Sequence, residues 1–162
     1  MGCFSMNVSH KNLLDATGLA LLRELQNFGR LSYRELGRRV GLSAPAVIER
    51  IRRMEHEGII TGYGARIDPQ KAGFPLRALS SMSTDFKNPD PYIAEKIHAI
   101  PEVIRCWSVT GENDYVIEIL ARSMGDLERI LGELTRLGKL CTSIILSSME
   151  KPTLPEEKGG NS

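Results

Sequence analysis

The sequence predicts an α+β fold in two parts, a helical N-terminal part and a C-terminal part in which strands and helices alternate. Two observations predict it. Apolar residues recur at helical spacing through residues 14–58. Between residues 76 and 149, runs rich in β-branched residues alternate with helical patterns, and Pro and Gly turn signals separate them. The order expected in the C-terminal part is βαββαβ, the ferredoxin-like arrangement of a four-stranded antiparallel sheet with both helices on one face.

Composition places the chain among ordinary globular proteins. It has 162 residues, 41% of them hydrophobic and 25% charged, which argues against disorder and allows one domain or two small ones. The net charge of +1 is unevenly distributed. Residues 1–68 carry 10 Lys and Arg against 7 Asp and Glu, whereas residues 69–162 carry 11 against 13. The positive charge is therefore concentrated in the helical part, as in a protein that meets a polyanion there.

Two short helices joined by a tight turn are expected in the middle of the helical part. Ser32 is a good N-cap, and Glu35, three residues later, completes a capping box. Gly41 ends this helix because glycine tolerates the left-handed conformation of a sharp stop. Ser43 can cap the next helix. A third helix before this pair, over residues 14–28, completes a three-helix unit.

The second helix of the pair has two contrasting faces. Val47, Ile51 and Met54 repeat at i, i+4 and i+7 and are expected to face a core. The other side carries Pro45, Glu49, Arg52, Arg53 and His56, with Ala46 and Arg50 along one edge. A basic helix alone is more often a solvated surface helix. Together with the caps and the glycine turn, however, this pattern favours a helix-turn-helix whose second helix enters a DNA major groove.

The remaining elements follow from turn signals and periodicity. Residues 59–68 favour an extended linker strand that Gly62 and Gly64 weaken, and Asp68-Pro69 marks a turn. In the C-terminal part we expect helices over residues 91–100 and 124–138, and strands over residues 76–86, 103–109, 114–121 and 142–149.

The face of the sheet without helices needs a cover. Its candidate residues are Trp107, Val109, Ile117 and Ile119 or their alternate neighbours. Such apolar residues favour burial against a second copy of the chain. A dimer would place two reading helices about a two-fold axis, which matches a palindromic site with half-sites roughly 34–36 Å apart or a multiple of that.

The chain resembles the leucine-responsive/asparagine regulator (Lrp/AsnC) family of bacterial and archaeal transcription factors. The resemblance covers residues 13–150 and rests on two stretches of sequence, LLDATGLALLRELQNFGRLSYRELGRRVGLSAPAVIERIRRMEHEGIITGYGARIDPQKAGFP at 13–75 and VTGENDYVIEI at 109–119. It implies a winged or simple helix-turn-helix domain at 13–58, a linker strand and turn at 59–75, a ferredoxin-like ligand-sensing and oligomerisation domain at 76–150, and flexible tails at 1–12 and 151–162.

The resemblance also implies site residues and partners. The DNA-binding positions are Ser32, Tyr33, Arg34, Ser43, Pro45, Ala46, Glu49, Arg50 and Arg53. The effector-binding positions are Thr110, Gly111, Glu112, Asn113, Asp114 and Tyr115. Family members form dimers that often associate into tetramers or octamers, and many bind a small amino acid between dimers. Family members commonly carry an aromatic residue where Asn113 stands, so an effector-independent regulator remains an alternative.

Other chemistry finds no support in the sequence. Cys3, Cys106 and Cys141 form neither a disulfide framework nor a CxxC half-site, and a reducing cytoplasm is the simplest interpretation. The three histidines match no metal-binding motif, and no catalytic triad, P-loop or dinucleotide fingerprint occurs. We therefore expect no catalytic residues, no metal and no cofactor.

Two alternatives remain. The first is an enzyme, because sirohaem decarboxylases look similar to this family across both domains. They use histidine and arginine in a cleft, and this chain has no histidine cluster. The second is a stand-alone sensor or assembly protein that has lost DNA binding, which the intact segment at 32–58 disfavours.

Overall fold

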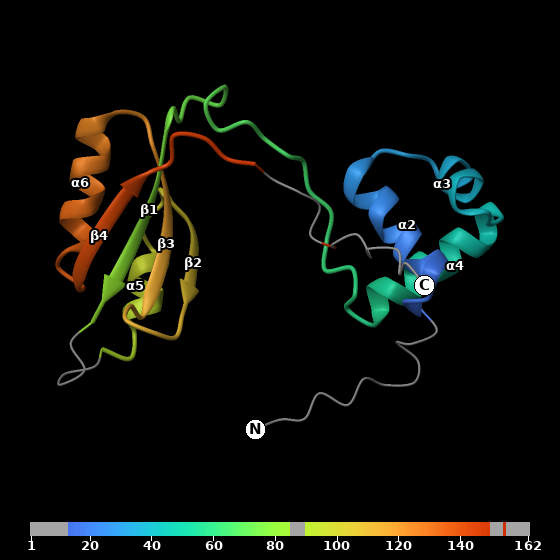
Figure 1. Cartoon of the computed structure of the whole chain (residues 1–162), viewed down its shortest axis with the longest axis horizontal. Helices are drawn as coiled ribbons and strands as arrows, with labels where there is room; N and C mark the ends of the chain where they lie inside the picture. Colours follow the sequence, from blue (N-terminus) through green and yellow to red (C-terminus); the bar gives the residue numbers. More distant parts are fainter. Residues whose placement is uncertain (1–12, 85–89, 150–153, 155–162) are drawn as a thin grey trace, which may run out of the picture. The chain divides into compact units, whose positions relative to one another are not determined.

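The computed structural model describes residues 13–84, 90–149 and 154 and divides into two units (Figure 1). One unit holds the described residues as far as Ala65, together with Leu154. The other unit is Arg66–Met149.

The first unit contains the three expected helices, α2 (Ala16–Asn27), α3 (Tyr33–Val40) and α4 (Ala44–His56) (Figure 1). They share a core in which Val47, Ile51 and Met54 of α4 are at most 2% exposed, as the periodicity predicts. No strand is found among the described residues of this unit, which form a simple helix-turn-helix without a wing.

A close backbone approach explains the glycine near the start of α2. The Asp15 carboxylate caps this helix by accepting a hydrogen bond from the Gly18 N–H at 2.7 Å. A Cβ on Gly18 would lie 1.8 Å from the Leu13 carbonyl oxygen. The helix therefore begins two residues later than expected, and glycine is required there because the preceding chain packs directly on the helix.

The helix pair is capped by its serines, but only half of the expected capping box forms. Ser32 Oγ accepts from the Glu35 N–H at 3.2 Å, as predicted. The Glu35 carboxylate does not return to the cap. It accepts instead from Arg38 at 2.8 Å and Arg39 at 3.2 Å. These two charged donors on the same helix give stronger hydrogen bonds than the neutral Ser32 N–H would.

The predicted linker strand is not a strand. Residues 59–75 have no strand partner within the described chain, and the glycines at 62 and 64 lower their tendency to extend. The first residues of this segment belong to the first unit, where the Tyr63 hydroxyl donates to Glu55 Oε1 at 2.7 Å.

The second unit has the predicted βαββαβ order. Its elements are β1 (Leu76–Ser83), α5 (Ile93–His98), β2 (Val103–Ser108), β3 (Tyr115–Ala121), α6 (Met124–Leu134) and β4 (Lys139–Ile144). The sheet is antiparallel with strand order β2-β3-β1-β4, and both helices lie on the same face of it (Figure 1). The core between the helices and the sheet includes Ile97, Ile117, Ile119, Ile130 and Leu134.

The last strand begins three residues earlier than expected. Helix α6 ends at Leu134 rather than at residue 138, and β4 starts at Lys139, paired with Ser83. Gly138 sets this start, because a Cβ there would lie 2.7 Å from the Ser83 carbonyl oxygen. Only glycine lets the chain pass this close to the end of β1.

The open face of the sheet carries the chain neighbours of Ile117 and Ile119 and not these two residues themselves. Ile117 and Ile119 are fully buried beneath the helices. Trp107 pairs with Val116, not with Ile117, so Trp107 and Val116 share the open face with Glu118. The sequence left both alternatives open, and the pairing of β2 with β3 selects Val116 and Glu118 for this face.

Candidate nucleic-acid interface and effector loop

The outer surface of the helix-turn-helix unit presents nearly all the predicted DNA-binding side chains. The exposed ones are Ser32, Tyr33, Arg34, Ser43, Pro45, Ala46, Glu49 and Arg53. They occupy the start of α3 and the face of α4 that points away from the core. A helix with this exposed face can lie in a groove without disturbing its packing.

The N-termini of α3 and α4 open onto one pocket. It has a volume of about 580 Å³, and its wall includes Ser32, Arg34, Arg38 and Ser43. Helix N-termini favour anions because free N–H groups and the helix dipole point at the ligand. Arg38 was absent from the predicted set. Its place four residues after Arg34, on the same helix face, is the signal that could have found it.

Arg53 is the best placed cation on α4. It is exposed, and no ion pair links it to another described residue. With Ala46 and Glu49 it lines a second, smaller cavity of about 230 Å³ on the same surface. A guanidinium with unused donors can take a phosphate or a guanine edge in bidentate geometry.

Arg50 is held differently from Arg53. Its guanidinium lies 2.5 Å from Asp15 Oδ2, and its side chain is 20% exposed. The hydrogen bond from Arg50 is the largest cause of the lowered pKa of Asp15, followed by the hydrogen bond from the Gly18 N–H. This ion pair ties α4 to the start of α2, so Arg50 has a structural role, and its contact with DNA stays a prediction.

The predicted effector loop is anchored to the end of β1. Asp114 Oδ2 accepts from the Thr84 N–H at 2.7 Å and from the Thr84 hydroxyl at 2.8 Å. The Ser83 hydroxyl lies 3.2 Å from both the Glu112 carbonyl oxygen and Asn113 Oδ1. Gly111 has φ of +121°, a conformation that favours glycine.

The other predicted loop positions differ in exposure. Thr110 and Glu112 are exposed, whereas Asn113, Asp114 and Tyr115 are partly buried. The loop therefore offers acceptors and turn N–H groups on a fixed frame.

Other candidate chemistry is not assembled in the described residues. They contain no group of three or more His, Cys, Asp or Glu side chains that could hold a metal ion. His56 and His98 are exposed and belong to different units, and His10 lies outside the described residues. Cys106 and Cys141 are free thiols, and burial raises the pKa of Cys106. No described helix is long and apolar enough to span a membrane.

A helix-turn-helix unit joined to a ferredoxin-like sheet unit defines a class of DNA-binding regulators with a ligand-binding domain. Family models match both parts: the AsnC-type helix-turn-helix domain at residues 14–55 and the Lrp/AsnC ligand binding domain at residues 87–154. The chain belongs to the Lrp/AsnC family of transcriptional regulators.

Individual relatives agree with this assignment. The chain is 38% identical over 138 residues to the HTH-type transcriptional regulator LrpA of Mycobacterium tuberculosis, covering 83% of this chain and 91% of the relative. It is 35% identical over 121 residues to the Bkd operon transcriptional regulator of Pseudomonas aeruginosa, covering 73% of this chain and 78% of the relative. These relatives are named as transcriptional regulators, not as enzymes.

Solved structures match both units. A feast or famine regulatory protein from M. tuberculosis in complex with L-methionine has a TM-score of 0.80 and 34% identity, covering 88% of this chain and 98% of that chain. A transcriptional regulator from Neisseria meningitidis, also in complex with L-methionine, has a TM-score of 0.81 and 29% identity, covering 88% and 96%.

Proposed function

We propose that the protein regulates transcription as a two-fold assembly that reads pseudo-palindromic promoter DNA with α4. The observation that carries the proposal is Arg53 on the outer face of α4, which is exposed, forms no ion pair with a described residue and lines a cavity with Ala46 and Glu49. Phosphates would occupy the helix starts, and α4 would supply the contacts to base edges.

The open face of the sheet supports the assembly. Trp107 is 44% exposed and Val109 36% exposed on the C-terminal half of β2 and just beyond it. On β3, in the same face, Glu118 is almost fully buried and forms ion pairs with Arg77 and Arg105. A face with exposed Trp107 and Val109, whose buried carboxylate is already paired with two arginines, suits burial against a second copy. We propose a dimer through this face, which associates further into a tetramer or octamer.

Replacement of Arg53 by alanine is expected to weaken binding to the chain's own promoter duplex by roughly 5- to 100-fold for each half-site. This range corresponds to the loss of one good side-chain contact in one half-site, and a two-fold assembly that loses the contact in both half-sites should lose the square of this factor. Fluorescence anisotropy at fixed salt measures it. The matched control is Arg136→Ala, which removes the same charge from an exposed position of the second unit.

Sedimentation should give the same oligomer for both variants and the wild type. An equal loss of affinity in the two variants would show that Arg53 contributes only through the net charge of the protein and not through a specific contact. A change of assembly in Arg53→Ala would assign that residue a structural role instead.

We also propose that the loop of residues 110–115 binds a small amino acid and that this shifts the assembly or its affinity for DNA. Support comes from the two L-methionine complexes of related proteins and from the acceptors that the anchored loop presents. Ligand coupling of this kind is typically worth about 1–3 kcal/mol.

A thermal-shift screen of the twenty amino acids checks the loop. At 100 times its dissociation constant, a ligand adds about 2.7 kcal/mol of stability, and we expect at least one amino acid to do so. In Asp114→Asn, which keeps an oxygen acceptor for Thr84 but loses the charge, this shift should shrink, while Glu128→Gln on exposed α6 should keep it. A screen without any shift would leave an effector-independent regulator.

A further inference from the structure

A pocket of the sheet unit lies where β2 begins and β3 ends, at the other end of these strands from the effector loop. Its volume is about 550 Å³. Its apolar wall consists of Phe74, Pro101, Ile104 and Leu120, and its polar wall of Glu102, Arg122, Ser123 and Asp126. It therefore combines a hydrophobic surface with both signs of charge, as small-ligand pockets do.

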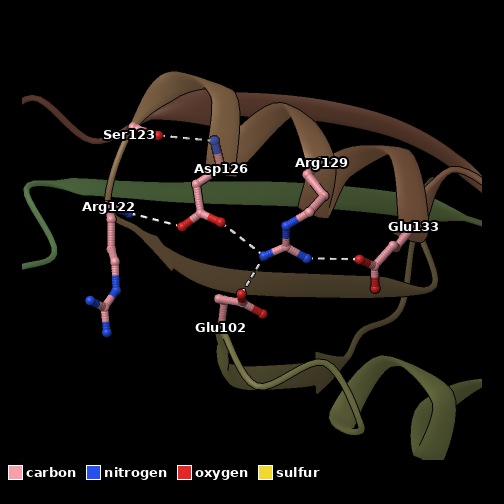
Figure 2. A network of polar contacts seen from close by, with 6 residues as sticks. All are labelled: Glu102, Arg122, Ser123, Asp126, Arg129 and Glu133. Carbon is pink, nitrogen blue, oxygen red and sulfur yellow. Dashed lines mark hydrogen bonds and ion pairs between the residues drawn. The ribbon is translucent and has the colours of Figure 1, made fainter.

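The acidic groups around this pocket converge on Arg129 (Figure 2). The Arg129 guanidinium pairs with Glu102, with Asp126 at 2.8 Å and with Glu133 at 2.8 Å. Three carboxylates thus share one guanidinium, which leaves an excess of negative charge on this side. Glu102 Oε2 is buried without a hydrogen-bond donor among the described residues, although the Glu102 side chain is 19% exposed.

The side chain of Arg122, the basic residue of the pocket, takes no part in that network. Only the backbone N–H of Arg122 joins it, by donating to Asp126 Oδ2 at 3.1 Å, and Figure 2 shows the side chain pointing away. The Arg122 guanidinium lies 4.9 Å from the centroid of the Phe74 ring, and no described residue accepts a hydrogen bond from it. A cation–π contact leaves the in-plane donors of a guanidinium available to a ligand.

We propose that this pocket binds a small zwitterion with an apolar side chain, a free α-amino acid, at a site separate from the effector loop. Arg122 holds the carboxylate, Glu102 accepts from the ammonium, and the side chain lies against Ile104, Leu120 and Phe74. A simple anion would face Glu102 and Asp126, and a simple cation would face Arg122. Only a ligand with both charges satisfies the two walls.

A ligand in this pocket would contact the segment that connects the two units. Phe74 belongs to the segment that leads from the first unit into β1, and its ring forms one wall of the pocket. A bound side chain packs on this ring and fixes the end of that segment. The inference goes beyond the proposed function and does not require the effector loop to bind anything.

Isothermal titration of the full chain with three probes of one shape tests the charge pattern. L-leucine carries both charges, L-leucinamide lacks the carboxylate, and 4-methyl-2-oxopentanoate lacks the ammonium. The titrations use Asp114→Asn, so that the loop contributes least. We expect leucine to bind this variant at least tenfold more tightly than either analogue. Absence of leucine binding, or an analogue that binds as tightly as leucine, would overturn the proposal.

Variants assign the binding to the pocket. In the Asp114→Asn background, Arg122→Gln and Glu102→Gln should each weaken leucine binding at least tenfold, while Arg136→Gln and Glu128→Gln, both exposed and outside the pocket, should not. Unliganded melting temperatures show whether each variant is folded. Glu102 also pairs with Arg129, so Glu102→Gln can fail to fold for a structural reason. In that case the test is decided by Arg122→Gln.

The pocket and the loop fail in different ways. If Asp114→Asn alone abolishes all leucine binding, the pocket is overturned and the loop stands. If leucine binding survives Asp114→Asn and is lost with Arg122→Gln, the pocket is supported whether or not the loop binds.

Discussion

Gly37→Ala is expected to destabilise the helix-turn-helix unit by about 3 kcal/mol, against the usual trend for helices. In an open helix interior, alanine is favoured over glycine by about 1 kcal/mol. In this chain, a Cβ on Gly37 would lie 2.4 Å from the Leu42 carbonyl oxygen. The clash is with backbone, so α3 and the turn must move apart.

The same contact defines the turn between α3 and α4. The Leu42 N–H donates to the Gly37 carbonyl oxygen at 2.8 Å, and Gly41 takes the left-handed conformation with φ of +73°. Moving α3 away from Leu42 would lengthen this hydrogen bond and shift Ser43, the cap of α4. Gly37→Ala should therefore weaken DNA binding as well as stability.

Urea unfolding followed by far-UV circular dichroism measures the effect. Gly132→Ala is the matched control, because Gly132 also lies inside a helix but nothing stands within 4 Å of its added Cβ. We expect Gly132→Ala to be neutral or to stabilise by up to about 1 kcal/mol. If Gly37→Ala were as stable as the wild type, the tight turn described above would be wrong.

Glu118→Gln is expected to destabilise the sheet unit by about 2 kcal/mol. Glu118 is 1% exposed on the open face, and its two oxygens accept from Arg77 and Arg105. Removing one partner of a buried ion pair costs about 3–5 kcal/mol because the other charge remains buried. The arginine side chains are 25% and 60% exposed, so water compensates part of that loss.

The second consequence of Glu118→Gln concerns assembly. With the carboxylate gone, two uncompensated guanidinium groups would lie on the face that we propose meets a second copy. Sedimentation equilibrium over a range of concentrations should show a weaker dimer, and Glu128→Gln should change neither stability nor assembly. An unaltered dimer in Glu118→Gln would argue that another surface joins the copies.

The features that the sequence predicted well are local ones. Ser32 and Ser43 cap their helices, Gly41 ends α3, and Val47 faces the core, because each depends on residues within one helical turn. The βαββαβ order also follows from local periodicity and turns.

The features that it missed depend on contacts between distant residues. The sequence left open which of Ile117 and Val116 faces the helices, and the packing of Ile117 in the core decides it, while the start of β4 is set by the approach of Gly138 to Ser83. The pairing of Arg50 with Asp15 crosses 35 positions of the chain. No periodicity within one element reports such pairings, so part of the candidate site had to come from the structure.

The salt dependence of binding to the promoter duplex tests the central claim most directly. A two-fold reader with 6–10 phosphate contacts should lose roughly 10³- to 10⁵-fold in affinity between about 50 and 200 mM salt. Its log K should fall linearly with log salt, and Arg53→Ala, which removes one side chain from each half of the two-fold reader, should reduce the slope by about two if Arg53 contacts a phosphate. A steep linear fall is the result we predict, and a flat response or no binding to the promoter would contradict it.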